Sequence, residues 1–133
     1  MLMVTSGAMA AVNPEGMPIV TEPLTLTVAV SQTPIQGDFN EMVILKNFEE
    51  TSGIDMEFQC IPSSDRKQQL SLMLASGEVP DILMKMSVSS TDQAKYADEG
   101  MFVALTDYID LMPNLNKYFE EFPTAKDAVT MPD

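Results

Sequence analysis

Two short polar stretches contain the side chains that could bind a ligand. They span residues 31–38 and 85–90, and each follows a run of apolar residues. Hydroxyls, amides and one ammonium group hydrogen-bond neutral polar or anionic ligands, so this chemistry suits sugars, peptides or oxyanions. The candidate ligand-binding residues are Ser31, Gln32, Thr33, Lys85 and Ser87.

Lys85 is the most notable candidate because its charge lies among the apolar residues Ile82–Met84 and Met86 of the predicted strand at residues 81–86. Two interpretations stay open. The ammonium could bind a ligand, or the side chain could reach solvent or a carboxylate while its methylenes cover apolar surface.

The sequence favours binding over catalysis. It contains no histidine, which is the commonest general base and a common metal ligand. It also lacks the nucleophile elbow, the phosphate-binding loop and the dinucleotide-binding fingerprint. Carboxylate pairs such as Asp107 with Asp110 suit the solvated first turn of a helix. Cys60 falls on the apolar face of a predicted strand, as a small buried hydrophobe would. We therefore expect no enzyme activity, no metal ion and no cofactor.

Charge and composition narrow the class of protein. The chain has 133 residues, 45% of them apolar, which fits one globular domain. Its net charge is −13, with only 7 Lys and Arg residues. Binding to nucleic acid or to an anionic membrane surface needs clustered positive charge, so both are disfavoured.

The first 23 residues predict a residual export signal or an extended leader. Ala8-Met9-Ala10 has the small-x-small pattern that signal peptidase cuts after, although no basic region precedes it. Three prolines and a glycine between residues 14 and 23 favour extended backbone.

Three strands alternate with helices in the next part of the chain. Residues 24–30 and 54–60 alternate apolar and polar side chains, and 81–86 form a short apolar run typical of a central parallel strand. Right-handed crossovers then give a parallel sheet in the order 2-1-3 with helices on both faces. The carboxyl ends of strands one and three form a topological switch point, which selects the two polar stretches as the ligand site.

Capping residues predict where the helices begin and end. Asp38, with Glu41 three residues later, predicts a helix that stops at Gly53. Ser63 or Ser64 begins a second helix that stops at Gly77. A third helix covers residues 91–99, and later helical segments begin at three further caps, Thr106, Asn114 and Thr124.

Several blocks of sequence resemble a known family. Phe48–Ile54 and Leu74–Ile82 are similar to the helix-glycine-strand phrases in the first lobe of extracellular solute-binding proteins (family 1 type) of bacterial ABC importers. Gly100–Ile109 and Met112–Leu115 are similar to segments that follow in that family, so the resemblance covers residues 24–133.

This resemblance implies a fold and a function. Members are two-lobed clamps that capture a solute outside the cell and deliver it to a membrane permease. We therefore expect an α/β chain in which residues 24–133 are the amino-terminal, truncated part of a three-layer first lobe of the periplasmic-binding-protein type II fold. The resemblance favours an oligosaccharide as the solute, but the chain has no Trp to stack on sugars. A peptide or an oxyanion stays open.

The sequence leaves two alternatives open. The chain could be a small acidic α/β interaction domain without a small-molecule ligand, or a small hydrolase, which would need an acid-base pair that the sequence lacks. We also expect self-association, because a three-stranded parallel sheet leaves an edge unpaired.

Overall fold

The computed structural model describes residues 12–130. The export-signal prediction therefore lies mainly at residues 1–11, outside the described residues. None of the helices in the described part has both the length and the apolar character needed to cross a membrane.

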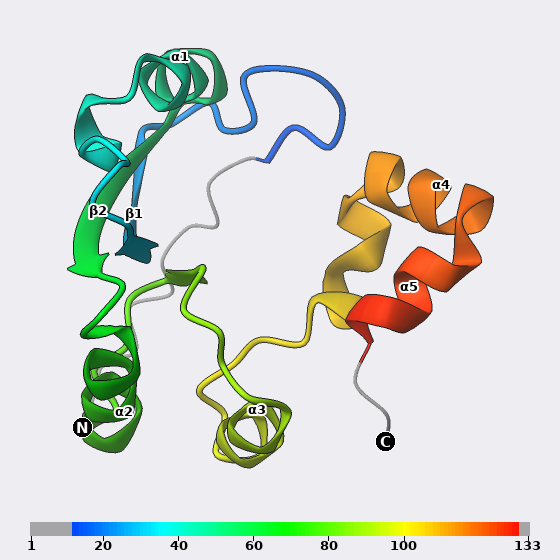
Figure 1. The fold of residues 1–133 in the computed structure, drawn as a ribbon. Helices are drawn as coiled ribbons and strands as arrows, with labels where there is room; N and C mark the ends of the chain where they lie inside the picture. Colours follow the sequence, from blue (N-terminus) through cyan, green and yellow to red (C-terminus); the bar gives the residue numbers. More distant parts are fainter. Residues whose placement is uncertain (1–11, 131–133) are drawn as a thin grey trace, which may run out of the picture.

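A three-stranded parallel sheet forms the centre of the structure (Figure 1). Strand β1 (Leu24–Gln32) lies between β2 (Ile54–Pro62) and β3 (Ile82–Met84). β1 pairs with β2 along its whole length, whereas β3 pairs only with Val28–Val30. The predicted order 2-1-3 is confirmed.

Helices cover both faces of this sheet, as predicted. The 3-10 helix η1 (Phe39–Glu41) and helix α1 (Val43–Ser52) lie over one face, and α2 (Arg66–Ser76) and α3 (Ser90–Asp98) lie over the other. Successive residues of a strand point to opposite faces. The cluster under α1 accordingly contains Val28, Val30, Phe39 and Phe58, and the cluster under α2 and α3 contains Ala29, Ile61, Leu70, Leu74 and Met86.

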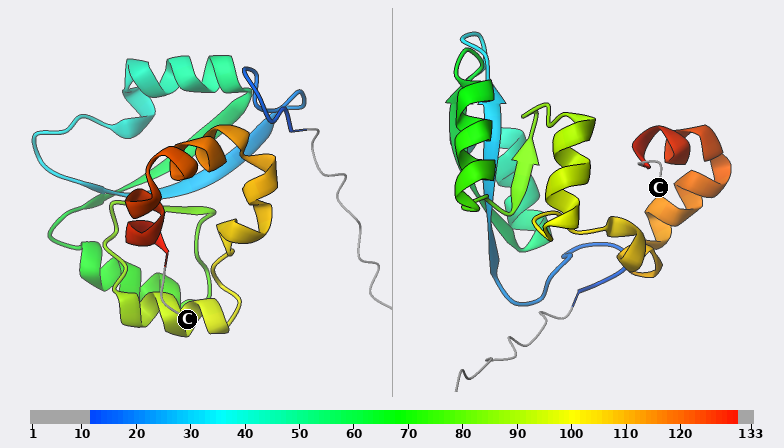
Figure 2. Two further views of the ribbon diagram at one scale, coloured as in Figure 1. Left: turned by 90° about the vertical axis from the view of Figure 1, so that its right-hand side faces the viewer. Right: turned by 90° about the horizontal axis from the view of Figure 1, so that it is seen from below.

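The last three helices pack on one another, away from the sheet (Figure 2). They are η2 (Leu105–Leu111), α4 (Pro113–Glu121) and α5 (Pro123–Val129). The predicted segments are present, but the predicted caps are wrong, because each helix begins before Thr106, Asn114 or Thr124. In α4 and α5 a proline takes the first helical position, where its fixed φ is favourable and its missing N–H is not needed.

The first predicted helix is two helices. The backbone at Met42 is extended, with ψ 121°, and separates η1 from α1. Asp38 accepts a hydrogen bond from the Asn40 N–H at 2.9 Å and so caps the short η1. Glu41 does not complete a capping box, because its carboxylate pairs with the Lys46 ammonium at 3.0 Å.

The outer edge of β2 is covered by side chains. The Asn40 amide donates to the Phe58 carbonyl and accepts from the Phe58 N–H, both at 3.0 Å. The Glu49 carboxylate accepts from the Met56 N–H at 2.9 Å. The Asn40 amide thus takes the place of a peptide group from a neighbouring strand, which leaves fewer open hydrogen-bonding groups on this edge.

Gly53 ends α1 where an amino-terminal segment crosses it. Its φ is +78°, and its N–H donates to the Glu49 carbonyl at 3.0 Å. The Ile19 and Val20 N–H groups donate to the carbonyl of Ser52, which places the Val20 carbonyl 2.7 Å from where a Cβ on residue 53 would lie. The predicted glycine stop is confirmed, and the close approach adds a second reason for glycine here.

We expect Gly53→Ala to lower the free energy of unfolding by about 1–3 kcal/mol, because alanine adopts this backbone conformation only under strain and its Cβ meets the Val20 carbonyl. Chemical denaturation measures the change. Gly37→Ala is the matched control, since its Cβ would meet nothing within 4 Å. Equal losses in the two variants would contradict this account.

Candidate ligand-binding site

The site predicted from the sequence lies at the carboxyl edge of the sheet. The chain leaves β1 into residues 33–38, leaves β2 into residues 63–65 and leaves β3 into residues 85–89. The chain runs from β1 to β2, which lies on one side of β1, whereas β3 lies on the other side. The topological switch point therefore falls between the carboxyl ends of β1 and β3.

Ser31 and Gln32 belong to β1, so the prediction that this strand ends at residue 30 is wrong. β2 continues far enough to pair Ser31 with Ile61 and Gln32 with Pro62. Ser31 is only 4% exposed, which withdraws its hydroxyl from the surface. Gln32 is half-buried, and its amide donates to the carbonyls of residues 36 and 37 at 3.1 and 2.8 Å, which closes the loop that follows.

Gln36 joins the two polar stretches that the sequence selects, residues 31–38 and 85–90. Its side-chain oxygen accepts three hydrogen bonds, from the Thr33 N–H at 3.0 Å, the Thr33 hydroxyl at 3.1 Å and the Lys85 ammonium at 3.0 Å. The Lys85 ammonium also lies 5.6 Å from the centre of the Phe39 ring. Of the described residues, no carboxylate forms an ion pair with Lys85.

Gln36 was not among the residues predicted from the sequence, although it lies in the loop after β1 and carries an amide that can hydrogen-bond a ligand. Its importance depends on a contact with a residue 49 positions away. No local pattern marks such a contact.

Lys85 and Ser87 both have left-handed backbone, with φ of 59° and 55°. Strand β3 therefore ends at Met84, and the prediction that Lys85 lies inside the strand is wrong. Residues other than glycine take this conformation at a cost of about 1–3 kcal/mol, and such residues concentrate at functional sites. Met86 lies between them and is 2% exposed, so its burial in the core offsets the strain.

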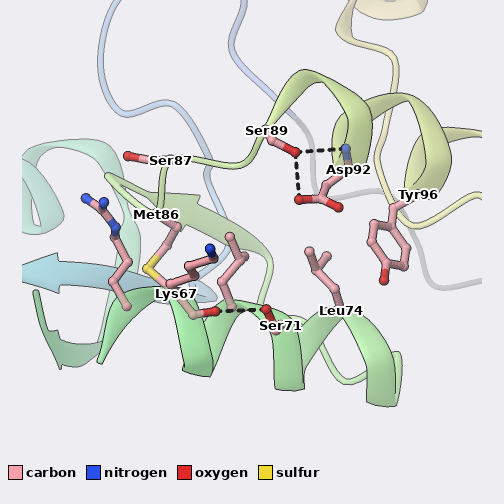
Figure 3. Close-up of a pocket in the computed structure, with 10 residues that line it drawn as sticks. Lys67, Ser71, Leu74, Met86, Ser87, Ser89, Asp92 and Tyr96 are labelled. Atoms are coloured by element: carbon pink, nitrogen blue, oxygen red, sulfur yellow. Dashed lines mark hydrogen bonds between the residues drawn. The ribbon is translucent and has the colours of Figure 1, made fainter. Parts of the chain in front are cut away.

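Two hollows open near this edge. One, of about 380 Å³, lies at the ends of β1 and β2 and is lined by residues 32–34, 36 and 62–64. The other, of about 250 Å³, lies between α2 and α3 (Figure 3) and includes Ser87. The structure thus brings Gln32, Thr33 and Lys85 together through Gln36, and it places Ser87 at a separate hollow.

Cys60 is half-buried in β2, and its thiol lies 3.5 Å from a carboxylate oxygen of Asp38. Burial raises the pKa of the Cys60 thiol. Hydrogen bonds from the backbone and side-chain N–H groups of Asn40 lower the pKa of the Asp38 carboxyl. The thiol stays protonated and therefore weakly nucleophilic, in agreement with the structural role predicted for it.

We expect Gln36→Met to speed hydrogen exchange at the Thr33 amide about three- to tenfold, because a lost hydrogen bond is worth about 0.5–1.5 kcal/mol. Exchange followed by NMR measures it. Gln59→Met, an exposed position on β2, is the matched control. Unchanged exchange at Thr33 in Gln36→Met would mean that this side chain does not hold the loop.

Comparison with known proteins finds similarity to bacterial solute-binding proteins. The family described as bacterial extracellular solute-binding protein matches residues 31–130. The fructooligosaccharide ABC transporter substrate-binding protein FusA of Streptococcus pneumoniae is 32% identical over 114 residues, which cover 84% of this chain and 21% of FusA. The polygalacturonan/rhamnogalacturonan-binding protein YtcQ of Bacillus subtilis is 27% identical over 73 residues, which cover 55% of this chain and 15% of YtcQ.

Solved structures agree with this likeness. FusA in complex with kestose has a TM-score of 0.74 and covers 82% of this chain, which in turn covers 22% of FusA. An HMO-binding, ABC-transporter-associated solute-binding protein from Bifidobacterium longum infantis has a TM-score of 0.71 at 26% identity, with 84% of this chain and 22% of that chain covered. The chain spans about a fifth of the length of these relatives.

Proposed function

Since this chain belongs to the family of bacterial extracellular solute-binding proteins, we propose that it forms the amino-terminal part of the first lobe of a protein that captures a solute and delivers it to an ABC importer permease. The polar network around Gln36 carries this proposal. It joins the loops after β1 and β3 at the switch point, where open α/β sheets bind ligands.

The proposed solute is an oligosaccharide. FusA and YtcQ are both named for carbohydrates. The hydroxyl, amide and ammonium groups at the carboxyl edge hydrogen-bond sugar hydroxyls well. Peptides and oxyanions share part of this chemistry and belong in the same binding panel.

We further propose that the protein acts outside the cytoplasm, at the cell surface or in the periplasm, and that it binds rather than converts its solute. The family and the transport role in the name of FusA support both statements. The net charge of −13 remains unfavourable for binding nucleic acid.

In the full-length product of the gene, we expect Lys85→Ala to weaken solute binding about tenfold or more, because a hydrogen bond to a charged group is worth about 1.5–3 kcal/mol. Glu57→Ala, exposed on β2, should change affinity little. Calorimetric titration of both variants with oligosaccharides measures the difference, and circular dichroism checks the fold. Equal affinities would place the site elsewhere.

Self-association through the outer edge of β3 is also proposed for the 133-residue chain. β3 has only three residues, and none of the described strands lies on its outer side. Its first residue, Ile82, is 39% exposed. Open strand edges of this kind pair with other chains, whereas the β2 edge is covered by Asn40 and Glu49.

We expect sedimentation velocity to show dimers or larger species that increase with concentration. Ile82→Lys should return the chain to monomer, because a charge on an edge strand opposes pairing. Leu72→Lys, exposed on α2, is the control that adds the same charge elsewhere. A parent chain that stays monomeric at every concentration would refute the proposal.

A further inference from the structure

We propose that the hollow between α2 and α3 is a second subsite, which takes a sugar residue that carries a carboxylate. This inference rests on the proposed function and goes beyond it, since it specifies the charge of the oligosaccharide. The hollow is separate from the network around Gln36, and of the five candidate ligand-binding residues only Ser87 lines it.

The hollow has an apolar floor and a polar rim (Figure 3). Leu70, Leu74 and Met86 form the floor, and each is less than 7% exposed. Polar side chains from α2, α3 and the loop after β3 surround this floor. At about 250 Å³ the hollow is smaller than the roughly 300–1,000 Å³ of pockets for drug-sized ligands, so it suits one ring rather than a whole oligosaccharide.

Two cations stand at the α2 side of this rim. Arg66 and Lys67 are the first residues of α2, and no acidic residue lies in that first turn. The amino-terminal end of a helix carries partial positive charge, so two cations there are placed against the helix dipole. Neighbouring Asp65 does not neutralise them by an ion pair, and its carboxylate accepts from the Ser64 hydroxyl at 2.9 Å.

A bound anion would offset the repulsion between the two cations and the positive end of α2. The Arg66 side chain is half-buried beside the hollow, and a guanidinium binds a carboxylate through two parallel hydrogen bonds. The protein as a whole is strongly negative and repels anions, so local positive charge is what an acidic ligand needs. A neutral sugar has no charged group to pair with either cation.

The α3 side of the rim offers groups that suit sugar hydroxyls and the ring itself. Asp92 is half-buried, and its carboxylate accepts from the Ser89 hydroxyl at 2.7 Å, which fixes its orientation. Tyr96 adds aromatic surface to the same wall. Cations on one wall and hydroxyl acceptors on the other match a ring that has a carboxylate on one side and hydroxyls on the other. A uronic acid residue has this distribution of groups.

The test compares two ligands of nearly equal shape, digalacturonate and its dimethyl ester, by calorimetric titration of the full-length gene product. Digalacturonate should bind at least tenfold more tightly than the ester, and added salt should weaken only the acid. Arg66→Gln should remove the preference for the acid. Lys117→Gln, which removes a cation from α4 outside both hollows, should keep it.

Thermal unfolding separates a ligand contact from a structural role. Arg66→Gln removes a positive charge from the positive end of α2, so its melting temperature should equal or exceed that of the parent protein. A variant that binds the acid less tightly without loss of stability supports the subsite. A variant that loses stability and weakens acid and ester equally overturns it.

The remaining outcomes distinguish this inference from the function on which it rests. If kestose or other neutral oligosaccharides bind but digalacturonate does not, or binds no better than its ester, the acidic subsite is wrong and the proposed function stands. If no carbohydrate binds, both are wrong.

Discussion

Burial of β1 on both faces is the constraint on which the rest of the structure depends. Val28, Ala29 and Val30 are at most 2% exposed, which requires helices above and below the sheet and neighbouring strands on either side. Asp81 fixes where β3 joins: its carboxylate accepts from the Thr27 N–H and hydroxyl at 2.8 and 2.7 Å. These bonds lower the pKa of the Asp81 carboxyl and keep it charged. The short third strand is thus aligned by a side-chain contact made just before it starts.

This alignment determines which side chains meet at the carboxyl edge of the sheet. Because the strands are parallel, their following loops emerge together, and Gln36 can reach both Thr33 and Lys85. The loop after β3 turns sharply because Lys85 and Ser87 are left-handed on either side of buried Met86. Buried Met86 therefore anchors the loop that carries the proposed ligand-binding residues Lys85 and Ser87.

The sequence predicted those features that depend on neighbouring residues. Alternation located β1 and β2, and Gly53 and Gly77, both left-handed, marked the ends of α1 and α2. It did not predict the break at Met42, because Asp38 and Glu41 match the sequence pattern of a capping box. In the structure the Glu41 carboxylate pairs with Lys46 and does not cap the helix. The sequence also missed the role of Gln36 and the extension of β1 through Gln32, since both depend on partners distant in the sequence.

Non-glycine residues with strained, left-handed backbone lie at the carboxyl edge of the sheet. At the opposite edge, before β2 and near β3, left-handed backbone is taken by Gly53 and Gly77, which adopt it without strain. At the carboxyl edge the same conformation is taken by Lys85 and Ser87. Glycine there would relieve the strain, but it would also remove an ammonium group and a hydroxyl. The residues at this edge are therefore better explained by the chemistry of their side chains than by the stability of the backbone, as expected where a protein binds a ligand.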